Sequence, residues 1–290
     1  MIIVSLIPLA IAFIGLLVGT YTDIKTREVP DWVNYGLIGT GFGLALLYSF
    51  IFLNWDYFFN SLVGFVAFFL VAVFMFYSGQ WGGGDSKMIM ALGALIGLDI
   101  SFKGFPFLVG FFINALLIGA VYGIIWTIVL AVKHKNKFLK EIKKVLINKK
   151  VVLARRYLLI TSLIFIIMVL FIKDLSLKIT MLGLVLIAFI TFYVWIFIKV
   201  VEKAAMFKYV KPTELTEGDW IAQEVIVGGK KICGKKDLGI EKKQINELVS
   251  LYKKKKIKKI LIKEGIPFVP SFLVAFVVSL FFGNVFLWFF

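Results

Sequence analysis

Long apolar runs are the feature that most restricts how this chain can fold. They lie at residues 1–20, 33–53, 57–78, 86–100, 105–132, 157–173, 177–200 and 266–290. Most have the roughly 20 residues that a helix needs to cross a bilayer, and none has the two-residue alternation of outer-membrane strands. The fourth run is short and could form a re-entrant pair with the fifth. The sequence therefore predicts a polytopic α-helical membrane protein with about six to eight transmembrane helices.

The basic residues indicate how these helices are oriented. If the N-terminus lies outside, all Lys and Arg residues except Lys103, Lys173 and Lys178 fall in or beside the loops that follow the first, third, fifth and seventh runs. Cytoplasmic loops carry such an excess of positive charge. We therefore expect a multi-pass protein of the cell membrane with both termini outside. The net charge of +16 then indicates anchoring at membrane lipids, and we expect no nucleic-acid partner.

Two of the cytoplasmic segments are long. Residues 133–156 are basic, and the apolar side chains among them recur at helical spacing, which predicts an amphipathic surface helix or a simple positive anchor. Residues 200–265 are expected to form a small α+β subdomain, with strand character at 220–227, a hairpin turn at Gly228-Gly229 and a returning strand near 257–262. An amphipathic helix is predicted between the turn and that strand from the spacing of Ile245, Leu248, Val249 and Tyr252.

Two acids stand at predicted helix ends on the cytoplasmic side. Asp85 follows three glycines at the start of the fourth run, and Asp23 follows the end of the first. A carboxylate at a membrane helix end either caps the helix or has a function, and the local pattern does not decide between the two. Gly82 and Gly84 are expected to permit close backbone approach, although a flexible hinge would have the same composition.

Other hydrolytic chemistries find no support in the sequence. There is no His-Glu-x-x-His motif, and the single Cys233 leaves no four-cysteine zinc site, so we expect neither a metal nor a cofactor. The one histidine, His134, lies in a lysine-rich segment. A pair of carboxylates remains. Two close carboxyl groups share a proton, so that one can activate a water molecule while the other acts as an acid.

In three segments the chain resembles the archaeal preflagellin and type IV prepilin peptidases. The segment from Tyr21 to Trp32 is similar to their Asp-x-Lys-x-Arg-x-Ile/Val-Pro motif, and the segment from Gly82 to Lys87 is similar to Gly-x-Gly-Asp followed by Lys. The tail that begins at Gly265 resembles the Pro-Phe-x-Pro start of their last helix. The resemblance implies a membrane aspartic endopeptidase, with Asp23 and Asp85 at the positions of the catalytic aspartates.

The resemblance also implies a substrate and a division of the chain. The substrate would be an archaellin or pilin-like precursor whose short basic leader is cut at the cytoplasmic face. Lys25, Arg27 and Lys87 either support the acids or anchor the helix ends by snorkelling. We expect a membrane domain at 1–132 that carries both aspartates, a basic loop at 133–156, transmembrane helices at 157–199, the subdomain at 200–265 and a last transmembrane helix at 266–290.

Two other functions stay open on the residues alone. The same aspartates could bind a proton or cation in a transporter, although hardly any other ionisable group lies inside the predicted spans. The chain could also be a non-catalytic membrane subunit of a machine that assembles surface filaments. The sequence does not predict the oligomeric state.

Overall fold

The computed structural model describes residues 2–99, 105–234, 237 and 239–289, without the side chains of 2–5 and 289. The predicted end of the fourth run at Ile100, and Lys103, lie outside the described residues. Six helices among these residues are long and apolar enough to cross a membrane, and a small α+β region follows them. The chain is therefore a multi-pass membrane protein, as predicted.

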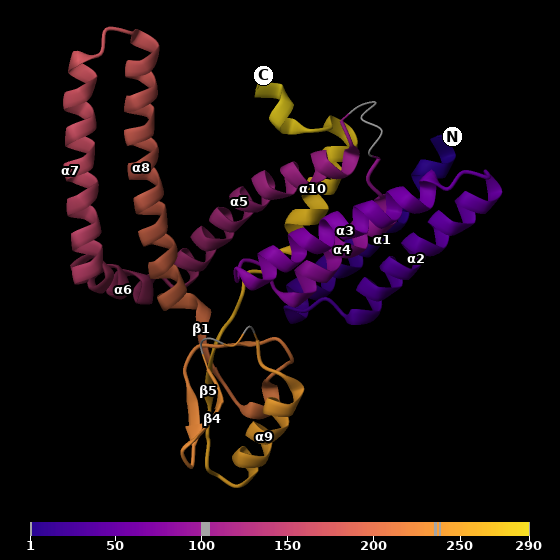
Figure 1. Cartoon of the computed structure of the whole chain (residues 1–290). Coiled ribbons are helices and arrows are strands. Elements are labelled where there is room, and N and C mark those ends of the chain that lie inside the picture. Colours follow the sequence, from indigo (N-terminus) through magenta and orange to yellow (C-terminus); the bar gives the residue numbers. More distant parts are fainter. Residues whose placement is uncertain (1, 100–104, 235–236, 238, 290) are drawn as a thin grey trace.

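The first five helices and the last α-helix form a bundle (Figure 1). They are α1 (Ile2–Thr26), α2 (Asp31–Ile51), α3 (Asp56–Tyr77), α4 (Gly83–Ile96), α5 (Phe107–Lys133) and α10 (Val269–Phe282). The core is apolar and continuous, and it includes Met88, Phe111 and Phe272, which are fully buried. Close van der Waals packing of apolar side chains from distant segments holds this bundle together, because lipid is as apolar as these side chains and gives little hydrophobic driving force.

Helix α4 lies in the middle of the bundle because glycines let its neighbours approach. A Cβ on Gly41 of α2 would lie 2.8 Å from the backbone of Ala94 and Leu95. Gly64 of α3 and Gly93 of α4 likewise face each other backbone to backbone. The fourth apolar run is short, and the helix that it forms is deeply buried. Most of its residues from Met88 to Leu95 are inaccessible to solvent.

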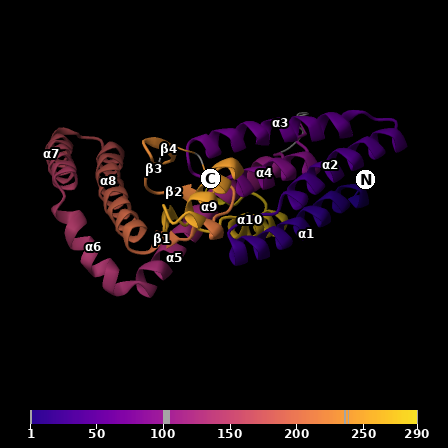
Figure 2. The same ribbon diagram turned by 90° about the horizontal axis from the view of Figure 1, so that it is seen from below.

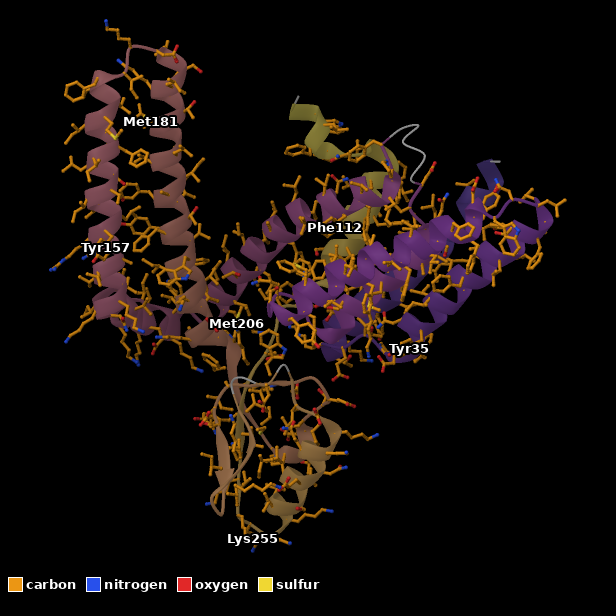
Figure 3. The ribbon with its side chains drawn as sticks, viewed as in Figure 1. Tyr35, Phe112, Tyr157, Met181, Met206 and Lys255 are labelled. Carbon is orange, nitrogen blue, oxygen red and sulfur yellow. The ribbon has the colours of Figure 1, made fainter. Side chains whose placement is uncertain are left out.

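Helices α7 (Lys149–Phe171) and α8 (Leu175–Val201) form a hairpin that stands apart from the bundle. Seen from below in Figure 2, the short helix α6 (Lys135–Ile147) connects α5 to α7. Figure 3 shows side chains of this hairpin, among them Tyr157 and Met181, spread along its surface. Few of its side chains are buried by the rest of the chain, as expected for a hairpin that faces lipid.

The α+β region, which we call the lobe, contains residues 202–264. A π-helical turn, Glu202–Met206, leads into β1 (Phe207–Val210), which pairs antiparallel with β5 (Ile260–Lys263). Strand β5 pairs on its other edge with β2 (Trp220–Ile221), and β3 (Val225–Val227) and β4 (Lys230–Cys233) form a separate hairpin. Helix α9 (Lys242–Lys253) covers these strands and buries Leu248 against them. The lobe lies beneath the bundle in Figure 1.

Several predicted bounds differ from the structure. Helix α1 continues to Thr26, so that Asp23 lies in the helix rather than in a polar loop. The basic segment is divided at Asn148, whose side chain accepts a hydrogen bond from the Lys150 N–H (3.0 Å) and caps α7. The predicted strand at 220–227 is interrupted between β2 and β3.

The last helix is also shorter than predicted. Helix α10 ends at Phe282, where Gly283 adopts a φ of +68°, and a 3-10 turn, Val285–Phe289, follows. A helix of 14 residues is about 21 Å long, less than the roughly 30 Å of the hydrocarbon core. The expectation of one continuous transmembrane helix over 266–290 was therefore wrong in its extent.

Candidate active site

Asp23 lies in the last turns of α1 and caps a different helix. Its side chain is only 5% exposed, and its Oδ2 accepts a hydrogen bond from the backbone N–H of Val269 (3.0 Å). Val269 is the first residue of α10, and the next residue, Pro270, has no N–H to satisfy. The first N–H groups of a helix lack partners within it and favour a carboxylate. Asp23 thus joins the end of α1 to the start of α10.

Asp85 occupies the first turn of α4. Its Oδ2 accepts a hydrogen bond from the N–H of Gly82 (3.0 Å), the residue before the helix. Its side chain is partly buried, and its carboxyl group lies within electrostatic range of that of Asp23. Each acid therefore accepts a hydrogen bond from the start of a helix. Both acids also lie at the same end of the bundle. Figure 3 marks this end with Tyr35 of α2.

Small residues bring the helices of the two acids together. Gly19 lies one helical turn before Asp23, and a Cβ there would meet Met88 of α4 at 2.7 Å and Val269 of α10 at 3.3 Å. Gly84 contacts the other segment, because a Cβ there would lie 3.2 Å from the backbone nitrogen of Val29. The loop after α1 and the start of α4 therefore touch directly. Gly82 is less restricted, since an added Cβ would meet only Asp85 Oδ2, at 3.4 Å.

An aromatic cluster fixes the glycine segment on α10. Trp81 is 2% exposed, and its ring lies 5.2 Å from that of Phe272 and 6.0 Å from that of Phe268. Phe268 in turn fits against Gly119 of α5, where a Cβ would approach its ring to 2.5 Å. The residues before Asp85 and the N–H that binds Asp23 are thus positioned by the same start of α10.

The three basic residues near the acids have different surroundings. Lys25 is exposed and interacts with Tyr21 on its own helix, at 3.3 Å from the hydroxyl. Lys87 pairs with Asp31 of α2 at 2.5 Å. These are surface contacts, which contribute little to stability. They tie Lys25 to its own helix and Lys87 to the start of α2.

Arg27 is held more closely. It follows α1 with a φ of +63°, a conformation that is uncommon for residues with a side chain. Its guanidinium lies over the ring of Trp126 in α5 at 5.3 Å, and its Nε pairs with Glu264 of the lobe at 3.8 Å. Arg27 therefore connects the end of α1, helix α5 and the segment that leads from the lobe to α10.

The lobe reaches both loops of the site. A Cβ on Gly79, just after α3, would lie 3.3 Å from the ring of Trp220 in β2. Burial, and to a smaller extent the nearby carboxylates of Glu28 and Glu264, raise the pKa of Asp219 above its ordinary value. The Gly218-Asp219 turn therefore lies near the loop that follows Asp23, a proximity that the sequence alone did not indicate.

Two contributors to the site were missed in the sequence because their roles depend on tertiary contacts. Trp126 lies within an apolar run that predicts only a membrane helix. Val269 contributes a backbone N–H, which any residue would supply. Among the residues that the structure describes, no three His, Cys, Asp or Glu side chains are grouped to hold a metal ion. What the site offers is acid–base chemistry from two carboxyl groups.

The segment that carries both acids is similar to known proteins. Residues 10–124 match the type IV leader peptidase family. This part of the chain, 115 of its 290 residues, is similar to that family. It contains both Asp23 and Asp85.

Curated relatives cover a similar share of the chain. The preflagellin peptidase of Methanocaldococcus jannaschii is 43% identical over 96 residues, which are 31% of this chain and 38% of that protein. The preflagellin peptidases of Methanococcus maripaludis and Methanococcus voltae are each 36% identical over 91 residues, 31% of this chain and 39% of theirs. The match thus spans well under half the length of these leader peptidase relatives. No solved structure matches the chain.

Proposed function

We propose that this protein is a membrane aspartic endopeptidase that removes short basic leader peptides from archaellin or type IV pilin-like precursors. Asp23 and Asp85 would be its catalytic residues. The observation that carries this proposal is the position of two partly or fully buried carboxyl groups at one end of the bundle, within the residues that match the leader peptidase family. The relatives named preflagellin peptidase support the substrate class.

The reaction needs no group beyond the two carboxyls and water. Close carboxyl groups share a proton, so one is ionised while the other is neutral. The ionised carboxylate takes a proton from a water molecule, whose oxygen attacks the carbonyl carbon of the scissile peptide bond. The neutral carboxyl group supplies a proton, which the leaving amine needs as the C–N bond breaks. Each turnover consumes one water, and the dyad finishes with the single proton with which it began.

Charge supports a basic leader as the ligand of the site. Although the chain has a net charge of +16, carboxylates gather beside the loop after Asp23, where Glu28 and Glu264 lie near Asp219. A positively charged peptide would be attracted there and would be repelled by the basic segment at 133–156. The expected sidedness places the site and the lobe at the cytoplasmic face, with both termini outside.

Purified protein in detergent or liposomes, mixed with a precursor that has a basic leader and an apolar helix, tests the proposal. We expect a single cut that leaves the apolar helix at the new N-terminus, as measured by mass spectrometry. A precursor whose leader lysines are changed to glutamine should be cut more slowly. An intact precursor, together with proton or cation flux into protein-containing liposomes, would instead support the transporter reading.

A further inference from the structure

A second polar feature lies beside Asp23 and is not explained by the dyad. Among the residues that the structure describes, the Tyr122 hydroxyl and the Arg27 Nη1 are both buried atoms without a hydrogen-bond partner. A buried polar group without a partner destabilises the folded protein. Two such donors near one carboxylate therefore require a reason, and the usual one is a partner that arrives with the substrate.

The contacts of α5 place Tyr122 next to Asp23. Gly119, Tyr122 and Trp126 follow one another at helical spacing on one face of the helix. Gly119 packs against Phe268, whose neighbour Val269 donates to Asp23.

At the other end of this face, Trp126 lies under the guanidinium of Arg27, the residue that directly follows α1, four positions after Asp23. Tyr122 therefore lies between residues that contact the start of α10 and the residue after α1, and these are the same two segments that lie next to Asp23. Its hydroxyl lies within electrostatic range of both Asp23 and Arg27.

We infer that Tyr122 and Arg27 donate hydrogen bonds to the carbonyl oxygen of the peptide bond that is cut. This inference rests on the proposed peptidase function and deepens it. As water adds to the carbonyl carbon, the oxygen gains negative charge and accepts more strongly from a hydroxyl and a guanidinium. Donors already fixed in a site that excludes bulk water stabilise that charge without reorganising. Arg27 is held in place by Trp126 and Glu264, and Tyr122 by its ring contact with Trp126 (5.8 Å).

The variant Tyr122→Phe tests this directly, because it removes only the hydroxyl. We expect kcat for precursor cleavage to fall about 100-fold with little change in KM, as for the loss of one donor to a developing oxyanion. The matched control is Tyr48→Phe. Tyr48 of α2 also has a buried hydroxyl without a described partner, but its ring packs on Phe52 and Tyr57, beyond the far end of α2. That control should retain full activity.

A stability measurement separates a substrate contact from a structural role. Since the hydroxyl has no partner in the resting protein, Tyr122→Phe should unfold at the same or a higher temperature than the parent protein. Arg27→Lys keeps the charge but loses the planar guanidinium, and it should also lower kcat. A kcat within twofold of the parent in Tyr122→Phe, or a rise in KM alone, would overturn the inference. If the dyad variants Asp23→Asn and Asp85→Asn stay inactive in that case, the proposed function stands without it.

Discussion

Two neighbouring glycines in the segment before Asp85 have different surroundings. A Cβ on Gly84 would press on the backbone nitrogen and side chain of Val29 at 3.2–3.4 Å, whereas a Cβ on Gly83 would meet only the ring of Phe76, at 3.9 Å. The sequence predicted close backbone approach at Gly82 and Gly84, but the composition of the segment did not indicate which neighbour Gly84 would meet. The difference arises from a loop that lies more than 50 residues away in the sequence.

We predict that Gly84→Ala lowers kcat/KM for precursor cleavage by about tenfold or more, while Gly83→Ala leaves it unchanged. The added methyl group would displace the loop after α1 relative to α4, and small displacements of reacting groups are costly. Steady-state cleavage assays on both variants check this. Equal activities of the two would show that the contact between Gly84 and Val29 does not align the acids.

Cys233 allows the lobe to be tested at a single atom. Burial raises the pKa of its thiol to about 11, with Asp237 adding to the effect. Only the thiolate reacts with disulfide reagents, and at pH 8 about one thiol in a thousand would be ionised. We predict that labelling of the native protein at pH 8 is at least about 100-fold slower than in denaturant, as measured by absorbance of the released thiol. Rapid labelling of the native protein would mean that β4 is not packed as described.

For helices and strands, the sequence predicted their presence and type better than the residues at which they begin and end. Apolar runs predicted the membrane helices, and Gly228-Gly229 and the spacing from Ile245 to Tyr252 predicted the hairpin and α9, because these signals are local. The helical state of residues 21–26 was missed because most of their side chains are polar. The polar end of this helix is held by tertiary contacts, such as the hydrogen bond from the Val269 N–H to Asp23.

The close packing of α3 on α4 predicts the effect of a glycine substitution on stability. Gly64 and Gly93 face each other so closely that a Cβ on either would collide with the backbone of the other. We predict that Gly93→Ala destabilises the protein by about 1–3 kcal/mol, as overpacking does. Gly43→Ala, at an α2 position where nothing lies within 4 Å, should be neutral or slightly stabilising. Thermal unfolding in detergent measures both. A Gly93→Ala midpoint at or above that of Gly43→Ala would contradict this packing.

The whole molecule has three parts: the bundle with the two aspartates, the α7–α8 hairpin and the lobe beneath (Figure 1). The hairpin leads into the lobe through the turn Glu202–Met206, and Figure 3 labels Met206 there. Charge statistics predicted which ends of the helices share a side. They could not predict that α10 would be short, or that its first N–H would receive Asp23, because neither fact has a local signal in the sequence.

The sidedness of the molecule can be measured with single cysteines in a Cys233→Ser background. Lys173→Cys lies between α7 and α8, and Lys140→Cys lies in α6 at the opposite end of the hairpin. Both positions are exposed. We predict that a membrane-impermeant maleimide labels Lys173→Cys in intact cells and labels Lys140→Cys only after lysis. The reverse pattern would place the aspartates at the outer face.

The most direct test of the account is cleavage of a leader-bearing precursor by Asp23→Asn and by Asp85→Asn. Asp56→Asn is the matched control, because Asp56 also lies in the first turn of a helix but is exposed and belongs to α3 at the other end of the bundle. We predict that both site variants fold and are inserted normally yet lose at least about 1000-fold in rate, since the dyad supplies both the base and the acid. The control should cleave like the parent. Substantial cleavage by either site variant would contradict the dyad.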